Sequence, residues 1–147
     1  MPRWVTHLHA WVYRRSGGRV LGRMGGQPVL LLQTTGRRSG RTRTTPVQYL
    51  ADGDTFVVVA SNAGAARPPA WYLNLRANPH ARIRVGARGI DVRAQEAAGQ
   101  ERMALWRRLT AANRYLERAA RKARRDLPLM ALAPSTPSGP RPSADRA

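Results

Sequence analysis

Short apolar runs separated by glycine, proline and aspartate dominate the chain after residue 27 and predict β-strands. Six runs have strand length: 28–34, 43–50, 55–61, 81–85, 89–96 and 127–134. ADGD after the second run and GAR after the fourth are hairpin signals, so neighbouring runs should pair antiparallel. Pro46 lacks an amide hydrogen and predicts that the second run lies at a sheet edge or a bulge.

Helical spacing of apolar residues occurs in three stretches. Residues 3–15 predict a short helix with tryptophans on one side and basic residues around it. Residues 70–77 predict a second short helix, which Asn78 and Pro79 stop. Residues 99–125 form the longest stretch, and the apolar residues near one face are Met103, Trp106, Leu109, Leu116 and Ala120.

Strands in hairpin order with helices inserted between them predict an α+β fold, with a small antiparallel barrel rather than a parallel α/β sheet. We divide the chain into a basic amphipathic segment (1–26), a barrel domain with flanking helices (27–133) and a tail (134–147). The tail is rich in proline and serine, a composition typical of disorder.

Basic residues outnumber acidic residues by 26 to 8, which gives a net charge of +18. A field this positive predicts an anionic partner: nucleic acid, a lipid surface or an anionic small molecule. Cysteine is absent, which excludes disulfides, thiolate metal sites and a cysteine nucleophile. No signal peptide is recognisable and the longest apolar runs are too short to span a bilayer, so we expect a cytoplasmic protein.

The residue patterns of metal-dependent, nucleophilic and paired-carboxylate enzymes are missing. His7, His9 and His80 are the only histidines and lack metal-site spacing, and the acidic residues form no catalytic pair. Neither a G-x-S-x-G elbow nor a nucleotide-binding glycine motif is present. If the protein is an enzyme, a cofactor therefore supplies the reactive group, and the protein supplies binding and orientation.

The stretch QTTGRRSGRTRTTP (33–46) concentrates positive charge in a short turn. Arg37, Arg38, Arg41 and Arg43 fall within seven residues, with glycines among them. Arginine forks match phosphate and carboxylate oxygens, and glycine lets backbone amides approach the same anion. A solvated basic hairpin turn explains these residues equally well, so composition leaves both interpretations open.

Two segments, LLLQTTGRRSGRTRTTPVQYL and VVVASNAGAARPPAWYLNLRANPHARI, resemble the deazaflavin-dependent nitroreductase family. Three motifs carry the resemblance, in this order: T-G-R-[RK]-S-G-x-x-R, A-S-x-x-G and W-Y-x-N-L-x-A-N-P. The resemblance implies a split β-barrel related to FMN-binding oxidases, reductase activity and use of the deazaflavin coenzyme F-420. FMN is the alternative cofactor.

The resemblance also implies which residues bind the coenzyme. Its phosphate and glutamate tail would be held by Arg37, Arg38, Ser39, Arg43, Thr44, Thr45 and Pro46. Its ring would lie near Val59, Ala60, Ser61, Asn62, Ala70, Trp71, Tyr72, Leu73, Asn74 and Leu116. For Trp71, Tyr72 and Leu73, packing of a short helix on the core is the alternative interpretation.

Two departures from the family pattern bear on activity. Many relatives carry lysine where this chain has Asn62, so one charge beside the coenzyme is lost. Tyrosines of the characterised nitroreductase align approximately with Asn113, Leu116 and Ala119, which implies an apolar lid that suits flat quinones better than nitro groups. Tyr72 and Tyr115 are the candidate proton donors.

We therefore expect an oxidoreductase in which reduced coenzyme F-420 delivers hydride to an electron-poor small molecule such as a quinone, an enone or a nitro compound. A coenzyme carrier without turnover is the first alternative. A nucleic-acid-binding protein is the second, and it is disfavoured because no reading motif is present. For the basic N-terminal helix, capping of the barrel is one interpretation, and peripheral contact with an anionic membrane is the other. The sequence identifies neither the acceptor nor the oligomeric state.

Overall fold

The structure, a computed structural model, describes residues 23–24 and 27–135 of the 147-residue chain. The helix predicted for residues 3–15 and the tail from residue 136 onward lie outside the described residues, as does the membrane contact predicted for the N-terminal segment. None of the described helices has both the length and the apolar composition that crossing a membrane requires.

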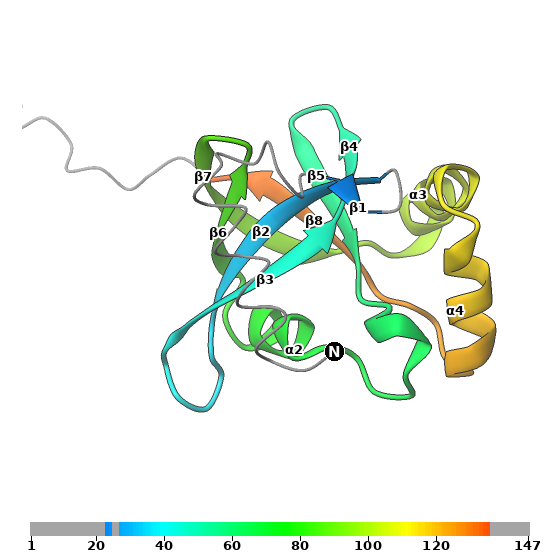
Figure 1. Ribbon diagram of the computed structural model, residues 1–147, viewed down its shortest axis with the longest axis horizontal. Helices are drawn as coiled ribbons and strands as arrows, with labels where there is room; N and C mark the ends of the chain where they lie inside the picture. Colours follow the sequence, from blue (N-terminus) through cyan, green and yellow to red (C-terminus); the bar gives the residue numbers. More distant parts are fainter. Residues whose placement is uncertain (1–22, 25–26, 136–147) are drawn as a thin grey trace, which may run out of the picture.

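A curled antiparallel sheet of eight strands forms the body of the described chain (Figure 1). The strands are β1 (Arg23–Met24), β2 (Gln27–Thr35), β3 (Thr42–Gln48), β4 (Leu50–Asp52), β5 (Thr55–Val59), β6 (His80–Val85), β7 (Arg88–Glu96) and β8 (Leu129–Pro134). Their order is β1-β2-β6-β7-β8-β5-β4, and β3 pairs with β2. The predicted antiparallel barrel is thus confirmed.

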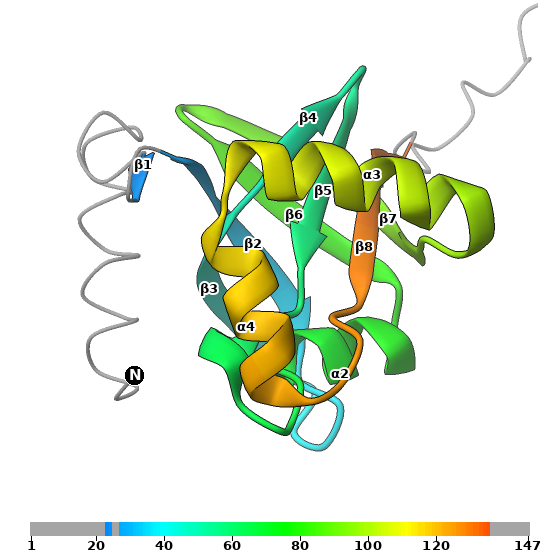
Figure 2. The ribbon, with the colours of Figure 1, turned by 90° about the vertical axis from the view of Figure 1, so that its right-hand side faces the viewer.

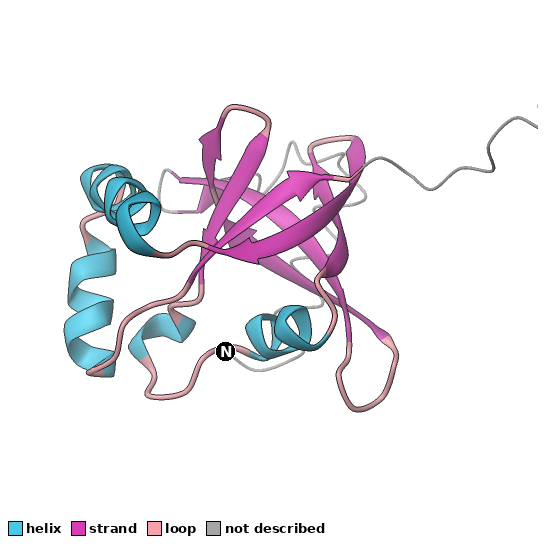
Figure 3. Ribbon diagram, turned by 180° about the vertical axis from the view of Figure 1, so that it is seen from behind, coloured by secondary structure: helices cyan, strands magenta, loops and turns pink. Residues whose placement is uncertain are grey.

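Three α-helices and one 3-10 turn flank the sheet: η1 (Asn62–Gly64), α2 (Ala70–Ala77), α3 (Gly99–Ala112) and α4 (Tyr115–Ala123). Figure 2 shows α3 lying across β5 and β8, with α4 running down from its end. The same view and Figure 1 place α2, η1 and the β2–β3 loop together at one end of the sheet. Seen from behind in Figure 3, the hairpins β4–β5 and β6–β7 occupy the opposite end.

The single helix predicted for residues 99–125 is wrong, because the chain forms α3 and α4 with a break at Asn113. Asn113 has an extended backbone, and its Oδ1 accepts a hydrogen bond of 3.1 Å from the Tyr115 amide. An asparagine side chain that satisfies a free amide at a helix start favours a new helix there. The predicted apolar face is partly wrong: Leu109 is buried as expected, but Met103 is 57% exposed and Leu105, which was not predicted, is buried.

The single strand predicted for residues 43–50 is likewise two strands. The chain leaves the line of β3 at Tyr49, whose amide donates to the Pro28 carbonyl, and β4 then pairs with β5 instead of β2. Because of this break, residues 42–52 pair with two different strands of the curled sheet, β2 and β5. The hairpins β4–β5 and β6–β7 follow the predicted turns.

Pro46 lies opposite Leu31 in an unbroken β2–β3 ladder. Proline has no amide hydrogen, so a continuous antiparallel ladder requires Pro46 to occupy a non-hydrogen-bonded pair, with its nitrogen facing away from β2. Thr44, two residues earlier, presents its backbone amide and carbonyl to that same outer edge. Among the described strands β3 pairs only with β2, which agrees with the predicted edge position.

Two regions of packing hold the helices on the sheet. The barrel interior is filled by a buried apolar cluster that includes Leu30, Leu32 and Ile83 from the strands and Trp71 and Leu75 from α2. A second cluster lies between the sheet and the α3–α4 pair; it contains Val57, Ala97, Leu105, Leu109, Leu116 and Leu129. Burial of these side chains is the main term that fixes the helices in place.

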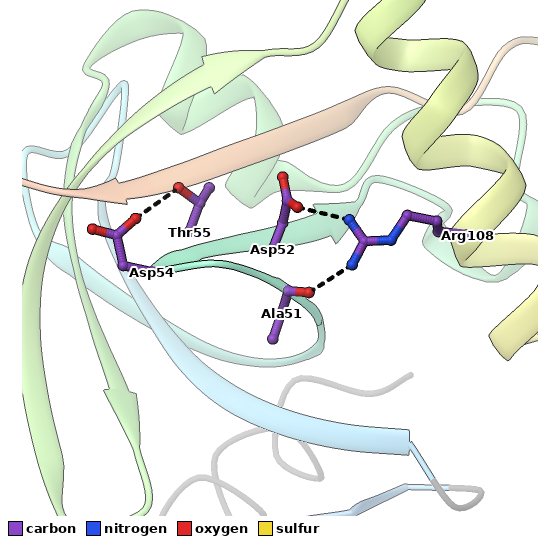
Figure 4. Close-up of polar contacts among 5 residues, drawn as sticks. All are labelled: Ala51, Asp52, Asp54, Thr55 and Arg108. Carbon is purple, nitrogen blue, oxygen red and sulfur yellow. Dashed lines mark hydrogen bonds and ion pairs between the residues drawn. The ribbon is translucent and has the colours of Figure 1, made fainter.

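Arg108 of α3 adds a polar contact to the β4–β5 hairpin (Figure 4). Its guanidinium donates to Asp52 Oδ1 at 2.7 Å and to the Ala51 carbonyl at 3.0 Å. Both charged side chains are about half exposed, so solvent screens the pair and its contribution to stability is below about 1 kcal/mol. The contact fixes where the helix meets the hairpin more than it stabilises the fold.

Candidate functional site

The arginine turn, residues 36–41 between β2 and β3, is a closed loop held by its own backbone. The Gly36 amide donates to the Arg41 carbonyl and the Gly40 amide to the Gly36 carbonyl, both at 2.8 Å. A Cβ on Gly36 would lie 2.6 Å from Ser39 Oγ and 3.2 Å from the Arg41 carbonyl, so any side chain there would displace Ser39 and the backbone of the turn. Gly40 has a φ of +70°, which glycine adopts without strain.

The turn's backbone amides are mostly used inside the protein. Besides the two glycine amides, the Arg41 amide donates to Ser39 Oγ at 3.2 Å and the Arg37 amide donates to Asn74 Oδ1. The prediction that glycines let these amides reach an anion is therefore wrong for Gly36 and Gly40. An anion at this turn would meet guanidinium forks and the Ser39 hydroxyl, which still has its own hydrogen to donate.

The four guanidinium groups of this region have no carboxylate partner within residues 27–135. Arg37, Arg38, Arg41 and Arg43 are all exposed, and the two ion pairs of the described chain, Arg82–Asp91 and Arg108–Asp52, lie elsewhere. Like charges this close raise the local positive potential, and an anion relieves their repulsion. The turn is therefore electrostatically suited to a polyanion.

Asn74 of α2 fixes the turn to the body of the protein. Its side chain is 4% exposed; Oδ1 accepts from the Arg37 amide at 3.1 Å, and Nδ2 donates to Thr34 Oγ1 at 3.1 Å. The amide thus joins the end of β2, the start of the turn and α2. Its predicted contact with coenzyme stays a prediction, whereas its contacts within the protein make it an anchor for the turn.

The segment after β5 has an irregular backbone. Val59 ends the strand, Ala60 is fully buried, and Asn62 and Ala63 have φ values of +46° and +54°. Asn62 Nδ2 donates to the Arg67 carbonyl at 2.9 Å, which closes the loop that follows. Left-handed residues other than glycine are strained and cluster at ligand-binding loops, so this segment is a candidate contact for the coenzyme ring.

The aromatic residues of α2 pack mainly into the barrel. Trp71 and Tyr72 belong to the interior cluster, Leu73 packs partly against it, and Ala70 is exposed. This placement supports the core-packing interpretation for Trp71 and Tyr72.

The Tyr72 hydroxyl donates to Glu96 Oε1 on β7, and the Arg76 guanidinium lies 6.0 Å from the Tyr72 ring centroid. Burial, followed by the hydrogen bond to Glu96, raises the pKa of Tyr72 above 10.

This raised pKa gives the Tyr72→Phe variant a distinct pH dependence. The stabilising contribution of the Tyr72 hydroxyl is complete below pH 10 and is lost as pH rises, because unfolded tyrosine then ionises first. Tyr72→Phe should lower the free energy of unfolding by about 0.5–1.5 kcal/mol at pH 8, and the difference should shrink above pH 10. Urea unfolding followed by circular dichroism between pH 8 and 11 measures both. Tyr115→Phe, which alters an exposed hydroxyl, is the control; a Tyr72→Phe difference that stays constant with pH contradicts the expectation.

The remaining predicted residues lie on α4. Tyr115, at its start, is 48% exposed and lies about 6 Å along the helix axis from Ala119, whose carbonyl is next to Gly64 of η1. Leu116 is buried with Val57 and Leu129, and Ala119 is buried with Leu127. The expected apolar lid formed by Leu116 and Ala119 is therefore wrong: these side chains face the barrel and fill its packing. The role of Leu116 in coenzyme binding stays a prediction.

Sequence comparison with known proteins identifies the family of this chain. The sequence profile of the F420H(2)-dependent quinone reductases matches residues 4–134. A quinone reductase of this name from Mycobacterium tuberculosis is 38% identical over 125 residues, which cover 82% of this chain and 84% of the relative. The chain belongs to the F420H(2)-dependent quinone reductase family. The family resemblance inferred from the arginine turn and the two later motifs is confirmed.

Solved structures of similar fold agree with the family assignment. An F420-H2-dependent reductase has a TM-score of 0.66 and 30% identity, covering 71% of this chain and 93% of that chain. A Listeria innocua protein provisionally described as a pyridoxamine 5′-phosphate oxidase has a TM-score of 0.52 and 14% identity, covering 74% of this chain and 84% of that chain. The second likeness shows the fold alone. The barrel of this quinone reductase family member is thus a split barrel.

Proposed function

We propose that this protein transfers hydride from reduced coenzyme F-420 to a quinone. Membership of the quinone reductase family makes the chain an oxidoreductase that uses this coenzyme. The arginine turn carries the proposal: four exposed arginines without a carboxylate partner in residues 27–135 lie in and beside a loop that Asn74 of α2 holds by a hydrogen bond. Such a turn is a preformed site for a polyanionic molecule.

The donor set fits the coenzyme's tail, which carries a phosphate and glutamate carboxylates. Arg37, Arg38 and Arg43 offer planar forks for these oxygens, and the Ser39 hydroxyl offers a further donor. The outer edge of β3 adds the Thr44 amide beside Pro46, which cannot donate. Because this set suits several negative charges in a row, it favours the long tail of coenzyme F-420 over the single phosphate of FMN.

The ring of the coenzyme would be held at the same end of the sheet. Val59 to Asn62 and the exposed start of α2 at Ala70 are the residues expected to contact it, and Thr45 and Pro46 continue the site along β3. When bound, the coenzyme supplies the hydride donor for the reaction. The protein's part is to bind the tail, orient the ring and exclude water from one face of it.

Reduction of a quinone to a hydroquinone by one hydride also needs one proton. The Tyr72 hydroxyl donates to Glu96, so its proton is held at Oη by an internal partner. Tyr115 is 48% exposed, so its side chain can reach solvent. We propose that solvent, or Tyr115 in contact with solvent, provides the proton at the acceptor oxygen.

The proposal is tested by titrating the purified protein with coenzyme F-420 and with FMN while following cofactor fluorescence, then measuring oxidation of the reduced coenzyme with acceptors. We expect tighter binding of F-420 than of FMN, and turnover with a hydrophobic quinone such as menadione. No binding of F-420 would contradict the proposal. Binding without turnover would favour the carrier alternative.

A further inference from the structure

Arg125 forms a dense set of hydrogen bonds that no sequence motif indicated. It follows the end of α4, and Arg124, with a φ of +53°, turns the chain there. The Arg125 guanidinium donates to the carbonyl oxygens of Ala60, Ser61, Ala65 and Arg67, at distances of 3.1 to 3.3 Å. One side chain therefore reaches four carbonyls of a single eight-residue stretch, residues 60–67.

This stretch has little regular structure of its own. It contains the two left-handed residues Asn62 and Ala63, and one short 3-10 turn. Its internal backbone bonds run from Gly64 to Ser61 and from Ala65 to Asn62. Carbonyl oxygens that converge on one point repel one another unless a donor sits between them. The planar guanidinium, with donors on three nitrogens, is such a donor.

A close backbone contact joins the same stretch to α4. A Cβ on Gly64 would lie 3.2 Å from the Ala119 carbonyl and 3.0 Å from Lys122 Cδ, and Gly64 has a φ of +77°. Glycine is therefore required where η1 meets α4. With Arg125 at one side and Gly64 at the other, residues 60–67 and α4 are held as one unit.

We propose that Arg125 is a positioning residue that holds residues 60–67 in the form that binds the coenzyme ring. This inference rests on the proposed function. Arg125 acts through the backbone of Ala60 and Ser61, which the site uses, and does not itself touch the coenzyme. Lysine cannot replace it, because a single ammonium has no planar fork to span four carbonyls.

The test compares Arg125→Ala and Arg125→Lys in the full chain, with Arg121→Ala as the matched control on the exposed side of α4. Hydrogen exchange of residues 60–67 is measured first, without coenzyme. Fluorescence titration then gives the F-420 dissociation constant, and quinone turnover gives KM and kcat.

For both Arg125 variants we expect roughly tenfold faster hydrogen exchange in residues 60–67 and roughly tenfold or greater weakening of coenzyme binding. Millimolar guanidinium should partly restore binding to Arg125→Ala, and Arg121→Ala should match the unsubstituted chain.

Unchanged coenzyme affinity in both Arg125 variants, with the unsubstituted chain binding normally, overturns this inference and leaves the proposed function intact. Full rescue by Arg125→Lys also overturns it, because a simple charge would then suffice. If Arg125→Ala does not fold, the same measurements on Arg125→Lys test the inference. This variant keeps the charge and the apolar stem of the side chain. Failure of the unsubstituted chain to bind F-420 overturns both this inference and the proposed function.

Discussion

Replacing Arg38 with alanine should weaken coenzyme F-420 binding by about 10- to 100-fold. The change removes a charge-assisted hydrogen-bonding fork, and each such group contributes about 1.5–3 kcal/mol. Arg38 is exposed in the arginine turn and has no carboxylate partner within residues 27–135, so its loss should leave the fold intact. Fluorescence titration of the coenzyme measures the change. Salt should weaken binding to the unsubstituted protein more than to Arg38→Ala, because fewer charges then contribute.

Two further variants make this result specific to the turn. Arg43→Ala should weaken binding on the same scale, because Arg43 is the second residue of β3, directly after the turn, and its side chain lies beside Gly36. Arg88→Ala, an exposed arginine at the far end of the sheet, removes the same charge from the molecule and should leave binding within about twofold. Equal weakening by all three would show that net charge, rather than this turn, attracts the coenzyme.

Replacing Asn74 with alanine should lower both stability and coenzyme affinity. The buried amide satisfies the Arg37 amide and Thr34 Oγ1, and the change leaves both without this partner. An unsatisfied buried polar group costs about 1–3 kcal/mol, so the free energy of unfolding should fall by that amount. The turn then loses its link to α2, and coenzyme binding should weaken. Denaturant unfolding and coenzyme titration on the same protein measure the two effects.

Asn78→Ala is the matched control for this variant. Asn78 is the C-cap residue of α2, and its side chain also accepts one backbone hydrogen bond, from the His80 amide at an exposed position. Its replacement should cost little, because water can take the place of the lost partner. An Asn74→Ala protein as stable as Asn78→Ala, with normal affinity, would rule out the anchoring role of Asn74.

The sheet was predictable because its signals are local. Alternating residues around GAR and the glycine in ADGD specify hairpins within about ten residues, and the structure forms both. The break in the long helix was not predictable from periodicity, because it depends on Asn113 turning its side chain back onto the chain. The helical spacing of apolar residues continues across Asn113, so the pattern alone predicts one helix.

Only those residues of the candidate site that belong to a sequence motif could be predicted. The arginine turn stands out in the sequence because four charges are close together. Asn74 was assigned to the coenzyme through a motif, but its contacts with Thr34 and Arg37 span 40 and 37 residues and required the fold. Arg125 sits in the basic run RRD and looks like any solvated arginine. Only the spatial convergence of four carbonyls distinguishes it.

The position of Pro46 has a consequence for self-association. An open strand edge is where another chain can add a strand and begin to aggregate, because rows of amides and carbonyls point outward. At Pro46 the outward row lacks a donor in the middle of β3, so an added strand would lose a hydrogen bond there. A small molecule that binds through its oxygens to the Thr44 amide and nearby guanidinium groups has no such requirement. One proline thus keeps the edge accessible to ligands while making it a poor template for aggregation.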